Sequence, residues 1–481
     1  MSKEKTKPGS LLGKEATGGE VADHGFKYQD GMLLARLPVW LAQSGFSQFI
    51  RESLGDSEAR FFVPGKGDHR EFNEYKDHRL TPCEFWPEID RFRELEEAHP
   101  GVYRAYRLVC PDVNDNLRAL CRALGRLRRT LPFYDGVSSI ASQSFDEFAA
   151  KVTTGSGRDR AYAEFVFKKV EVDFEAPRQL ELALAAFQAQ LERELPECSD
   201  LNGGQVRAAR NALGTLIASK VAEPISRSEV MDALRTAVPG FEFPTLGRTR
   251  LYTASEPESA WEDRPALVLE WQRFSGQGTR SFPDAVAWNE GLVELTQARG
   301  WVLSSGAPRT IRLQGTRRLS ASVALGTVFS ATSGFAIEIE NRGGLLRTDQ
   351  HPGPDTPRYE WQAEEANGEM ADEVAVVLSV KRQVAADVRS FLGSSCPIAL
   401  VLHSSDAMVS AEQMNLAVES VKERLSLAIS RAGASVVHLF LAVPGPFALF
   451  LGHRLNATCT IQCYEHTGGA TYVPTFRIAC T

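Results

Sequence analysis

The chain is 481 residues long, which exceeds one ordinary hydrophobic core and favours two or three domains. Hydrophobic residues make up 43% and charged residues 24%, as in most globular proteins, and the net charge of −7 excludes a protein that coats nucleic acid through bulk positive charge. Because the sequence has no run of about 18 apolar residues and no apolar secretory signal, we expect a cytoplasmic protein that does not enter a membrane.

The N-terminal part alternates between helical and strand-like segments. Residues 1–20 are polar and are expected to form a mobile tail. The predicted elements that follow, in chain order, are a helix from Val21, strands at 59–63 and 72–76 joined by a Pro-Gly-Lys-Gly turn, a helix near 88–97, a strand at 102–110 and a helix at 113–130. This alternation predicts an α/β sandwich.

The next segment, from about 141 to 240, is mainly helical, and one of its helices opens with a capping box at Ser226 and Glu229. Proline and glycine residues between 239 and 247 then mark a boundary. We therefore predict an N-terminal domain with a helical extension over 21–240 and a C-terminal domain over 241–481.

The C-terminal part is predicted to contain two successive α/β units. In the first, the predicted strands are 266–271, 310–313 and 335–340, and the predicted helices are 284–298 and 319–329. In the second, strands are predicted at 398–403, 436–442 and 458–464, with a helix capped by Ser410 and Gln413 after the first strand and a short helix to His453 after the second. This order is Rossmann-like.

The helix at 113–130 has an apolar face and a basic face. Leucines recur at helical spacing at Leu117, Leu120, Leu124 and Leu127, and arginines recur on the opposite face at Arg118, Arg122, Arg126 and Arg129. The arginine row suits the phosphates of double-stranded DNA, and a solvated helix face explains the same pattern.

Asp56, Glu74 and Lys76 form the pattern that points most directly to chemistry. Glu74 and Lys76 are two residues apart on a predicted strand, so their side chains share one face. Asp56 and Glu74 offer oxygen ligands for Mg²⁺ or Mn²⁺, and Lys76 offers a cation beside the attacking water of phosphodiester hydrolysis. Asp68 is the alternative first carboxylate; Asp56 is preferred because Asp68 lies in the glycine-rich turn.

The segment Gly25-Phe26-Lys27-Tyr28-Gln29, together with Glu74-Tyr75-Lys76, resembles the nuclease domains of CD-NTase-associated effectors. These domains belong to the restriction-endonuclease-like, PD-(D/E)xK superfamily. The resemblance implies that Gln29 faces the catalytic site, although an ordinary helix-surface amide remains the alternative. This chain departs from relatives that often carry Gln where it has Glu74.

Residues 436–476 resemble the end of a SAVED domain, and Ile311–Gly315 with Ala324–Gly326 resemble the matching part of its first half. The resemblance implies two fused CARF-like Rossmann units. It also implies binding of a cyclic di- or trinucleotide made by a partner CD-NTase synthase.

Ligands of open α/β sheets lie beyond the carboxyl ends of the strands, where loops and helix N-termini meet phosphates. The residues at such positions are Trp271, Gln272, Arg273, Gly315, Thr316, Arg317, Arg318, His403, Ser404, Pro444, Gly445, Pro446 and Phe447. Trp271 or Phe447 could stack on a base and the arginines could bind phosphates, whereas a core tryptophan and solvated arginines are the alternatives.

Other catalytic motifs are missing: the sequence has no GxxxxGK[ST] loop, no GxSxG elbow and no HExxH motif, and its eight cysteines form no CxxC pair. The resemblances therefore imply an antiphage (CBASS) effector. In such an effector, cyclic-nucleotide binding drives homo-oligomerisation and activates a metal-dependent endonuclease that degrades double-stranded DNA. The alternative is a non-catalytic cyclic-nucleotide receptor whose N-terminal domain only binds a partner protein.

Overall fold

The computed structural model describes residues 14–134, 138–177, 180–254, 266–276, 281–341, 344–365, 370–456 and 458–480. The chain divides into two compact units, and the main division falls between Thr245 and Leu246. Within the described ranges, no helix combines the length and apolar character needed to cross a bilayer.

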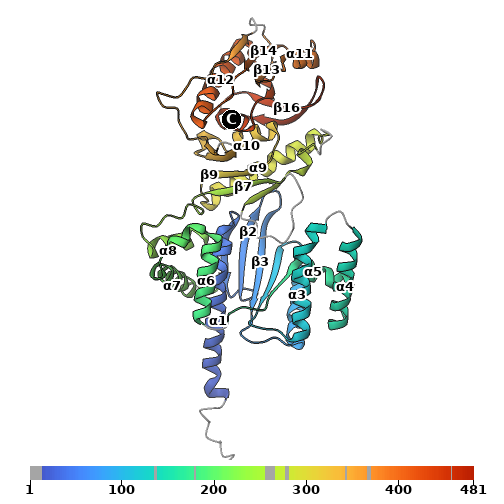
Figure 1. Cartoon of the computed structure of the whole chain (residues 1–481), viewed down its shortest axis with the longest axis vertical. Coiled ribbons are helices and arrows are strands. Elements are labelled where there is room, and N and C mark those ends of the chain that lie inside the picture. Colours follow the sequence, from blue (N-terminus) through green and yellow to red (C-terminus); the bar gives the residue numbers. More distant parts are fainter. Residues whose placement is uncertain are drawn as a thin grey trace, which may run out of the picture. The chain divides into compact units, whose positions relative to one another are not determined.

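The N-terminal unit is built on a six-stranded sheet with the strand order β5-β4-β3-β2-β1-β6 (Figure 1). Its strands are β1 (Phe46–Arg51), β2 (Ser57–Val63), β3 (Gly67–Tyr75), β4 (Tyr103–Val109), β5 (Val170–Asp173) and β6 (Ile225–Ser226). Its helices are α1 (Lys14–Ala42), α2 (Pro82–Ala98), α3 (Asp115–Thr130), α4 (Ser138–Ser156), α5 (Arg160–Lys169), α6 (Leu180–Glu194), α7 (Gly203–Ser219) and α8 (Arg227–Ala237).

The two faces of this sheet carry different helices because side chains alternate along β3 and β4. Phe72 and Tyr106 join a core formed with helices α2 to α5. Tyr75 and Val109 lie on the opposite face, where they pack with residues of α1 and α6. Figure 1 shows α3, α4 and α5 on one side of the strands and α1, α6 and α7 on the other. The predicted α/β sandwich is therefore present.

Helix α1 begins earlier than the sequence predicted. It starts at Lys14, so residues 14–20, which were expected to be tail, are helical, while residues 1–13 of that predicted tail lie outside the described residues. Gly18 and Gly19, which have low helix propensity, made this start hard to recognise. The predicted hairpin of β2 and β3, the strand β4 and the capping box of Ser226 and Glu229 are all present.

The C-terminal unit contains two sheets. The first has the order β11-β10-β9-β7-β8, and the second has the order β12-β14-β13-β15-β16-β17. The strands and helices of the first half are β7 (Thr249–Ala254), β8 (Leu267–Glu270), α9 (Ala285–Ser305), β9 (Thr310–Gly315), α10 (Leu319–Val328), β10 (Ala336–Asn341) and β11 (Gly344–Arg347). Those of the second half are β12 (Gln362–Glu365), β13 (Glu373–Val380), α11 (Ala385–Leu392), β14 (Ile398–Ser404), α12 (Ala411–Ala432), β15 (Val436–Ala442), α13 (Gly445–Arg454), β16 (Thr460–Gly468) and β17 (Thr471–Ala479).

Both sheets have a parallel centre. Strand β7 is parallel to β8 and β9, and β13 is parallel to β14 and β15, so each half has the Rossmann-like order that the sequence predicted. The sequence patterns did not single out the central strands β7 and β13, nor the edge strand β5 of the N-terminal unit.

The two halves of the C-terminal unit meet where α10 packs on α13. Gly326 and Gly452 lie at this contact, and a Cβ atom at Gly326 would overlap the carbonyl oxygen of Leu449, while one at Gly452 would overlap that of Val323. Glu465 of β16 adds a polar contact, because its Oε1 accepts hydrogen bonds from Ser320 N (2.9 Å) and Ser320 Oγ (2.7 Å). These contacts hold the halves together.

Candidate functional site

The first candidate site lies at the end of β3, where Glu74 and Lys76 share one face of the strand as predicted. The side chain of Glu74 is buried, and Lys76 Nζ lies 2.9 Å from Glu74 Oε1. Lys76 is fixed through its backbone as well, since its N–H donates to Val109 O of the neighbouring strand at 2.8 Å. The sheet therefore holds the side chains of Glu74 and Lys76 next to each other on the same face.

Asp56 and Gln29 join this site from two other segments. Gln29 Nε2 of α1 donates to Asp56 Oδ1 at 2.9 Å, and the Tyr75 N–H donates to Asp56 Oδ2 at 2.6 Å. Burial raises the pKa of the Asp56 carboxyl to about 6, and the negative charge of Glu74 adds to this shift. The structure thus brings together the four residues that the sequence singled out, and Gln29 contacts the site.

A constrained turn between β1 and β2 places Asp56. Glu52 has a positive φ of 55°, and its N–H donates to Asp56 O at 2.9 Å. A Cβ atom at Gly55 would overlap the ring of Phe72, so only glycine fits at this contact. The alternative carboxylate, Asp68, lies in a different place. Its side chain is 55% exposed and 4.0 Å from Arg60, and it is six residues from Glu74 along β3, or roughly 20 Å at the usual strand rise.

Sequence reasoning missed two residues of this site, Glu88 and Arg91 of α2. Glu88 Oε1 lies 2.6 Å from Lys76 Nζ, and Arg91 Nη2 forms an ion pair with Glu74 Oε2. Burial alone would lower the pKa of Lys76, but the hydrogen bonds and charges of Glu88 and Glu74 outweigh it, so the pKa is raised and Lys76 is a cation at neutral pH. The spacing of three residues between Glu88 and Arg91, on the edge of an amphipathic helix, was the available signal.

A divalent metal fits the donor set of this site. Asp56 and Glu74 are close enough for their charges to interact, and paired carboxylates are the ligands that hard cations prefer. No group of three or more His, Cys, Asp or Glu side chains in the described part of the chain is arranged to hold a metal. Mg²⁺ is commonly held by one or two carboxylates with water and substrate phosphates, so Asp56 and Glu74 suffice.

The arginine-bearing helix α3 has the predicted apolar face. Its buried leucines are Leu117, Leu120, Leu124 and Leu127. Arg122, Arg126 and Arg129 are exposed, whereas Arg118 forms an ion pair with Asp112 at 2.6 Å. Arg128, which the pattern did not include, donates to the carbonyl oxygens of Val166 and Phe167 and therefore holds the end of α5.

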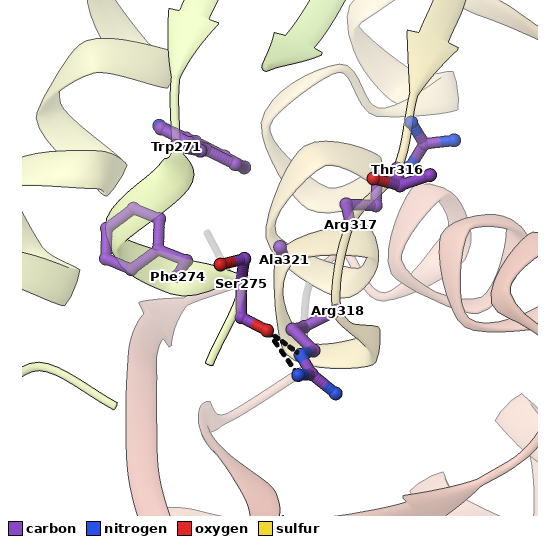
Figure 2. Close-up of a pocket in the computed structure, with 7 residues that line it drawn as sticks. All are labelled: Trp271, Phe274, Ser275, Thr316, Arg317, Arg318 and Ala321. Atoms are coloured by element: carbon purple, nitrogen blue, oxygen red, sulfur yellow. Dashed lines mark hydrogen bonds between the residues drawn. The ribbon is translucent and has the colours of Figure 1, made fainter. Parts of the chain in front are cut away.

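The second candidate site is a cavity of about 230 Å³ in the C-terminal unit. It lies beyond the carboxyl ends of β8 and β9, where the Rossmann-like order predicted a ligand. Its walls are formed by Trp271, Phe274, Ser275, Thr316, Arg317, Arg318 and Ala321. Figure 2 shows Trp271 and Phe274 on one side of this space and Thr316 with Arg317 on the other, while Arg318 reaches across to Ser275.

Arg317 and Arg318 are held by neutral groups. Arg317 Nη1 donates to the carbonyl oxygens of Gln314 (3.3 Å) and Gly315 (3.1 Å), and Arg318 Nε donates to Ser275 O (2.9 Å). Burial lowers the pKa of the Arg317 guanidinium to about 10, so it keeps its charge at neutral pH. Within the described ranges, neither arginine has a carboxylate at ion-pair distance.

Four of the predicted ligand residues have structural roles at or next to this cavity. Gly315 has a φ of 81°, and a Cβ atom there would overlap Thr253 O. Trp271 is buried, and its Nε1–H donates to Glu294 Oε2 at 2.8 Å. Arg273 forms an ion pair with Glu294 at 2.8 Å. Gln272 lies between them in a short 3-10 helix. Trp271 is therefore mainly a core residue, which was the alternative to a role in base stacking.

The remaining predicted ligand residues belong to the second half of the unit and do not line this cavity. His403 and Ser404 end β14, and His403 Nδ1 is 3.0 Å from Ser379 Oγ. Pro444 caps α13, and Gly445 and Pro446 form its first turn. Phe447 is fully buried and packs against Trp361 at 5.8 Å between ring centroids, so its ring has no exposed face for a base.

Comparisons with known proteins agree on the family. Residues 294–478 match the SAVED family, the SMODS-associated and fused to various effectors sensor domain. The chain is 33% identical to CD-NTase-associated protein 4 of an Acinetobacter species over 473 residues, which cover 98% of this chain and 99% of the relative.

Two solved structures of the Acinetobacter baumannii Cap4 SAVED/CARF-domain containing receptor are also similar. The structure with the cyclic trinucleotide 2'3'3'-cAAA is 29% identical, has a TM-score of 0.80 and is matched over 94% of this chain and 98% of that chain. The structure with 3'3'3'-cAAA is 30% identical, has a TM-score of 0.80 and is matched over 95% of this chain and 99% of that chain.

These similarities extend over both units, so they confirm the predicted fold class and the predicted kind of effector. The family match at 294–478 lies inside the predicted C-terminal domain. The chain therefore belongs to the CD-NTase-associated protein 4 (Cap4) family of CBASS effectors, with a SAVED domain in its C-terminal region.

Proposed function

We propose that the N-terminal unit is a metal-dependent endonuclease of double-stranded DNA, and that the SAVED domain activates it on binding a cyclic di- or trinucleotide made by a partner CD-NTase. Degradation of DNA then aborts the infection. The observation that carries the proposal is the convergence of Gln29, Asp56, Glu74 and Lys76 at the end of β3.

Each of these residues has a distinct task in the proposed reaction. Asp56 and Glu74 would hold Mg²⁺ or Mn²⁺, which when bound supplies positive charge to the scissile phosphate and acidifies water. Gln29 orients Asp56 by its hydrogen bond to Oδ1. Lys76 presents an ammonium group that can orient the attacking water or stabilise the charge that develops on the phosphate.

The cavity of the SAVED domain is the proposed site of one part of the cyclic ligand. Its volume of about 230 Å³ is below the roughly 300 to 1,000 Å³ of pockets for drug-sized ligands, so one nucleotide would enter while the rest of the ring stays outside. Arg317 and Arg318 supply two cations that can bind the negatively charged phosphates of the cyclic nucleotide. The solved relatives with cyclic trinucleotides support a ligand of this class.

A plasmid-cleavage assay tests the proposal. Supercoiled plasmid is incubated with the full chain, Mg²⁺ and a panel of cyclic di- and trinucleotides, and oligomeric state is followed by light scattering. We expect cleavage only with Mg²⁺ and one of the cyclic nucleotides, together with an increase in molecular mass. A ligand at about 100 times its Kd should also add about 2.7 kcal/mol of stability. Stabilisation without cleavage would instead support the non-catalytic receptor.

A further inference from the structure

The residues missed by sequence reasoning form a closed ring of ion pairs with Glu74 and Lys76. Lys76 lies between two carboxylates, with its Nζ 2.9 Å from Glu74 Oε1 and 2.6 Å from Glu88 Oε1. Arg91 lies between the other two oxygens, contacting Glu74 Oε2 and lying 3.5 Å from Glu88 Oε2. Each oxygen of Glu74 therefore faces a cation of the protein itself.

This arrangement places a cation of the protein against each oxygen of Glu74. A divalent metal bound by Asp56 and Glu74 would be repelled by Lys76 and by Arg91, so its binding favours the release of one of them. Arg91 is the cation more easily released, because its side chain is 44% exposed while that of Lys76 is 24% exposed. The guanidinium carbon of Arg91 lies 5.5 Å from the centre of the Phe72 ring, a contact that can keep Arg91 beside the site after it leaves Glu74.

We propose that Arg91 is a displaceable counter-ion of Glu74. Its guanidinium occupies the side of the Glu74 carboxylate at which a divalent cation would bind. The inference rests on the proposed nuclease function, since it concerns the same site. Glu88 is a positioning residue in this scheme, because it holds Lys76 and Arg91 at their places on either side of Glu74.

Displacement of Arg91 links metal binding to DNA binding. When a metal takes Glu74 Oε2, the guanidinium loses its main anion and needs another, and a DNA phosphate beside the site is a suitable one. Metal and DNA should therefore bind more tightly together than separately, and by linkage each should raise the affinity for the other equally.

The test is a titration of the full-length chain with Mn²⁺ without DNA, in which free Mn²⁺ is followed by electron paramagnetic resonance. Arg91→Gln is compared with wild type, with Glu74→Gln, and with Arg93→Gln as the matched control. Arg93 lies on the same helix but pairs with Glu97 and Asp159, away from the site.

We expect Arg91→Gln to bind Mn²⁺ about 1.5- to fivefold more tightly than wild type, the range of an ion pair with one exposed partner. Arg93→Gln should match wild type and Glu74→Gln should lose the binding. Unchanged or weaker binding by Arg91→Gln, an equal gain in Arg93→Gln, or no Mn²⁺ binding by any variant would overturn the inference.

Cleavage assays on the same proteins separate this inference from the proposed function. Tighter Mn²⁺ binding by Arg91→Gln without any plasmid cleavage by wild type would sustain the counter-ion and refute the nuclease. If wild type cleaves plasmid but wild type and Arg91→Gln have identical Mn²⁺ affinities, the nuclease function is supported and the counter-ion role of Arg91 is refuted.

Discussion

The candidate sites of the two units balance their charges differently. At the end of β3, Lys76 and Arg91 are each paired with carboxylates, so the positive charge is neutralised within the protein. In the cavity of the C-terminal unit, Arg317 and Arg318 donate to backbone carbonyl oxygens, and only Arg318 also interacts electrostatically with a buried carboxylate, that of Glu465. A cation held by carbonyl oxygens, such as Arg317, can take up an anion directly, whereas the cations at the end of β3 must exchange partners first.

The largest expected effect comes from removing Lys76, the cation that the proposed reaction requires. Lys76→Met keeps the length and apolar stem but removes the charge, so ligand-activated plasmid cleavage should fall on the order of 100-fold or more. Asp56→Asn should also abolish cleavage, but through weaker metal binding, so excess Mn²⁺ should partly restore Asp56→Asn and not Lys76→Met. Cleavage at the wild-type rate by Lys76→Met would favour the receptor-only function.

The comparison is sharpened by replacing one unpaired and one paired arginine of the C-terminal unit with Gln. Arg317→Gln removes a charge that has no carboxylate partner, so affinity for the cyclic ligand should fall about 10- to 100-fold. Arg273→Gln, whose charge is already paired with Glu294, should lower it much less. Isothermal titration with the activating nucleotide measures both, and equal losses would contradict the distinction.

His453 of the C-terminal unit and Asp56 of the N-terminal unit should change stability in opposite directions as the pH falls. Burial lowers the pKa of His453 to about 4, and the ring Nδ1 is 2.6 Å from Phe329 O. Because the unfolded state then binds the extra proton between pH 6.5 and 4, the stabilisation is complete above about pH 6.5 and is lost as the pH falls towards 4. The pKa of Asp56 is raised to about 6, so its contribution instead decreases as the pH rises through the acid range.

His453→Gln isolates this contribution. From about pH 7 to about pH 5, wild type should lose about 2 kcal/mol more unfolding free energy of the C-terminal unit than the variant loses. Urea unfolding of both proteins at the two pH values gives the difference. A loss of the same size in wild type and variant would show that His453 does not titrate as described.

The smallest effect concerns the exposed arginines of α3. Replacing Arg122, Arg126 and Arg129 together with Gln should weaken DNA binding a few-fold and reduce the slope of log affinity against log salt by about 0.9 for each DNA phosphate that the arginines neutralise in wild type. Arg118→Gln is the control, because Arg118 is already paired with Asp112. An unaltered salt slope in the triple variant would assign the arginines to a solvated face.

The sequence predicted the parts of the candidate nuclease site that depend on local geometry. Glu74 and Lys76 are two residues apart on a strand, and strand alternation alone puts them on one face. Glu88 and Arg91 were not recognised, because their spacing of three residues shows only that they share a face of α2. The spacing does not show that this face packs beside Glu74 and Lys76 of β3. Gln29 was recognised only through its resemblance to a family.

In the C-terminal unit, the rule that ligands lie at the carboxyl ends of strands located the cavity but selected too many residues. Thr316, Arg317 and Arg318 line it, whereas His403 and Phe447 satisfy the same rule in the other half and lie elsewhere. Strand β13 was missed although its apolar run is typical of a strand buried on both faces. Local sequence alone does not show which of the many strand ends in the two similar halves surround this cavity.

The glycine contact between α10 and α13 sets the mutational tolerance of the C-terminal unit. Neither Gly326 nor Gly452 has room for a methyl group, since the backbone of the opposing helix occupies that space. Saturation mutagenesis should therefore find these two positions intolerant of every substitution, although neither residue lines the cavity or carries a charge. Neighbouring exposed positions of the same unit, such as Leu427 on α12, should accept most residues. A screen for loss of function would then identify this helix contact as readily as the cavity. The cause would be the added side-chain volume, which the contact between α10 and α13 cannot accommodate.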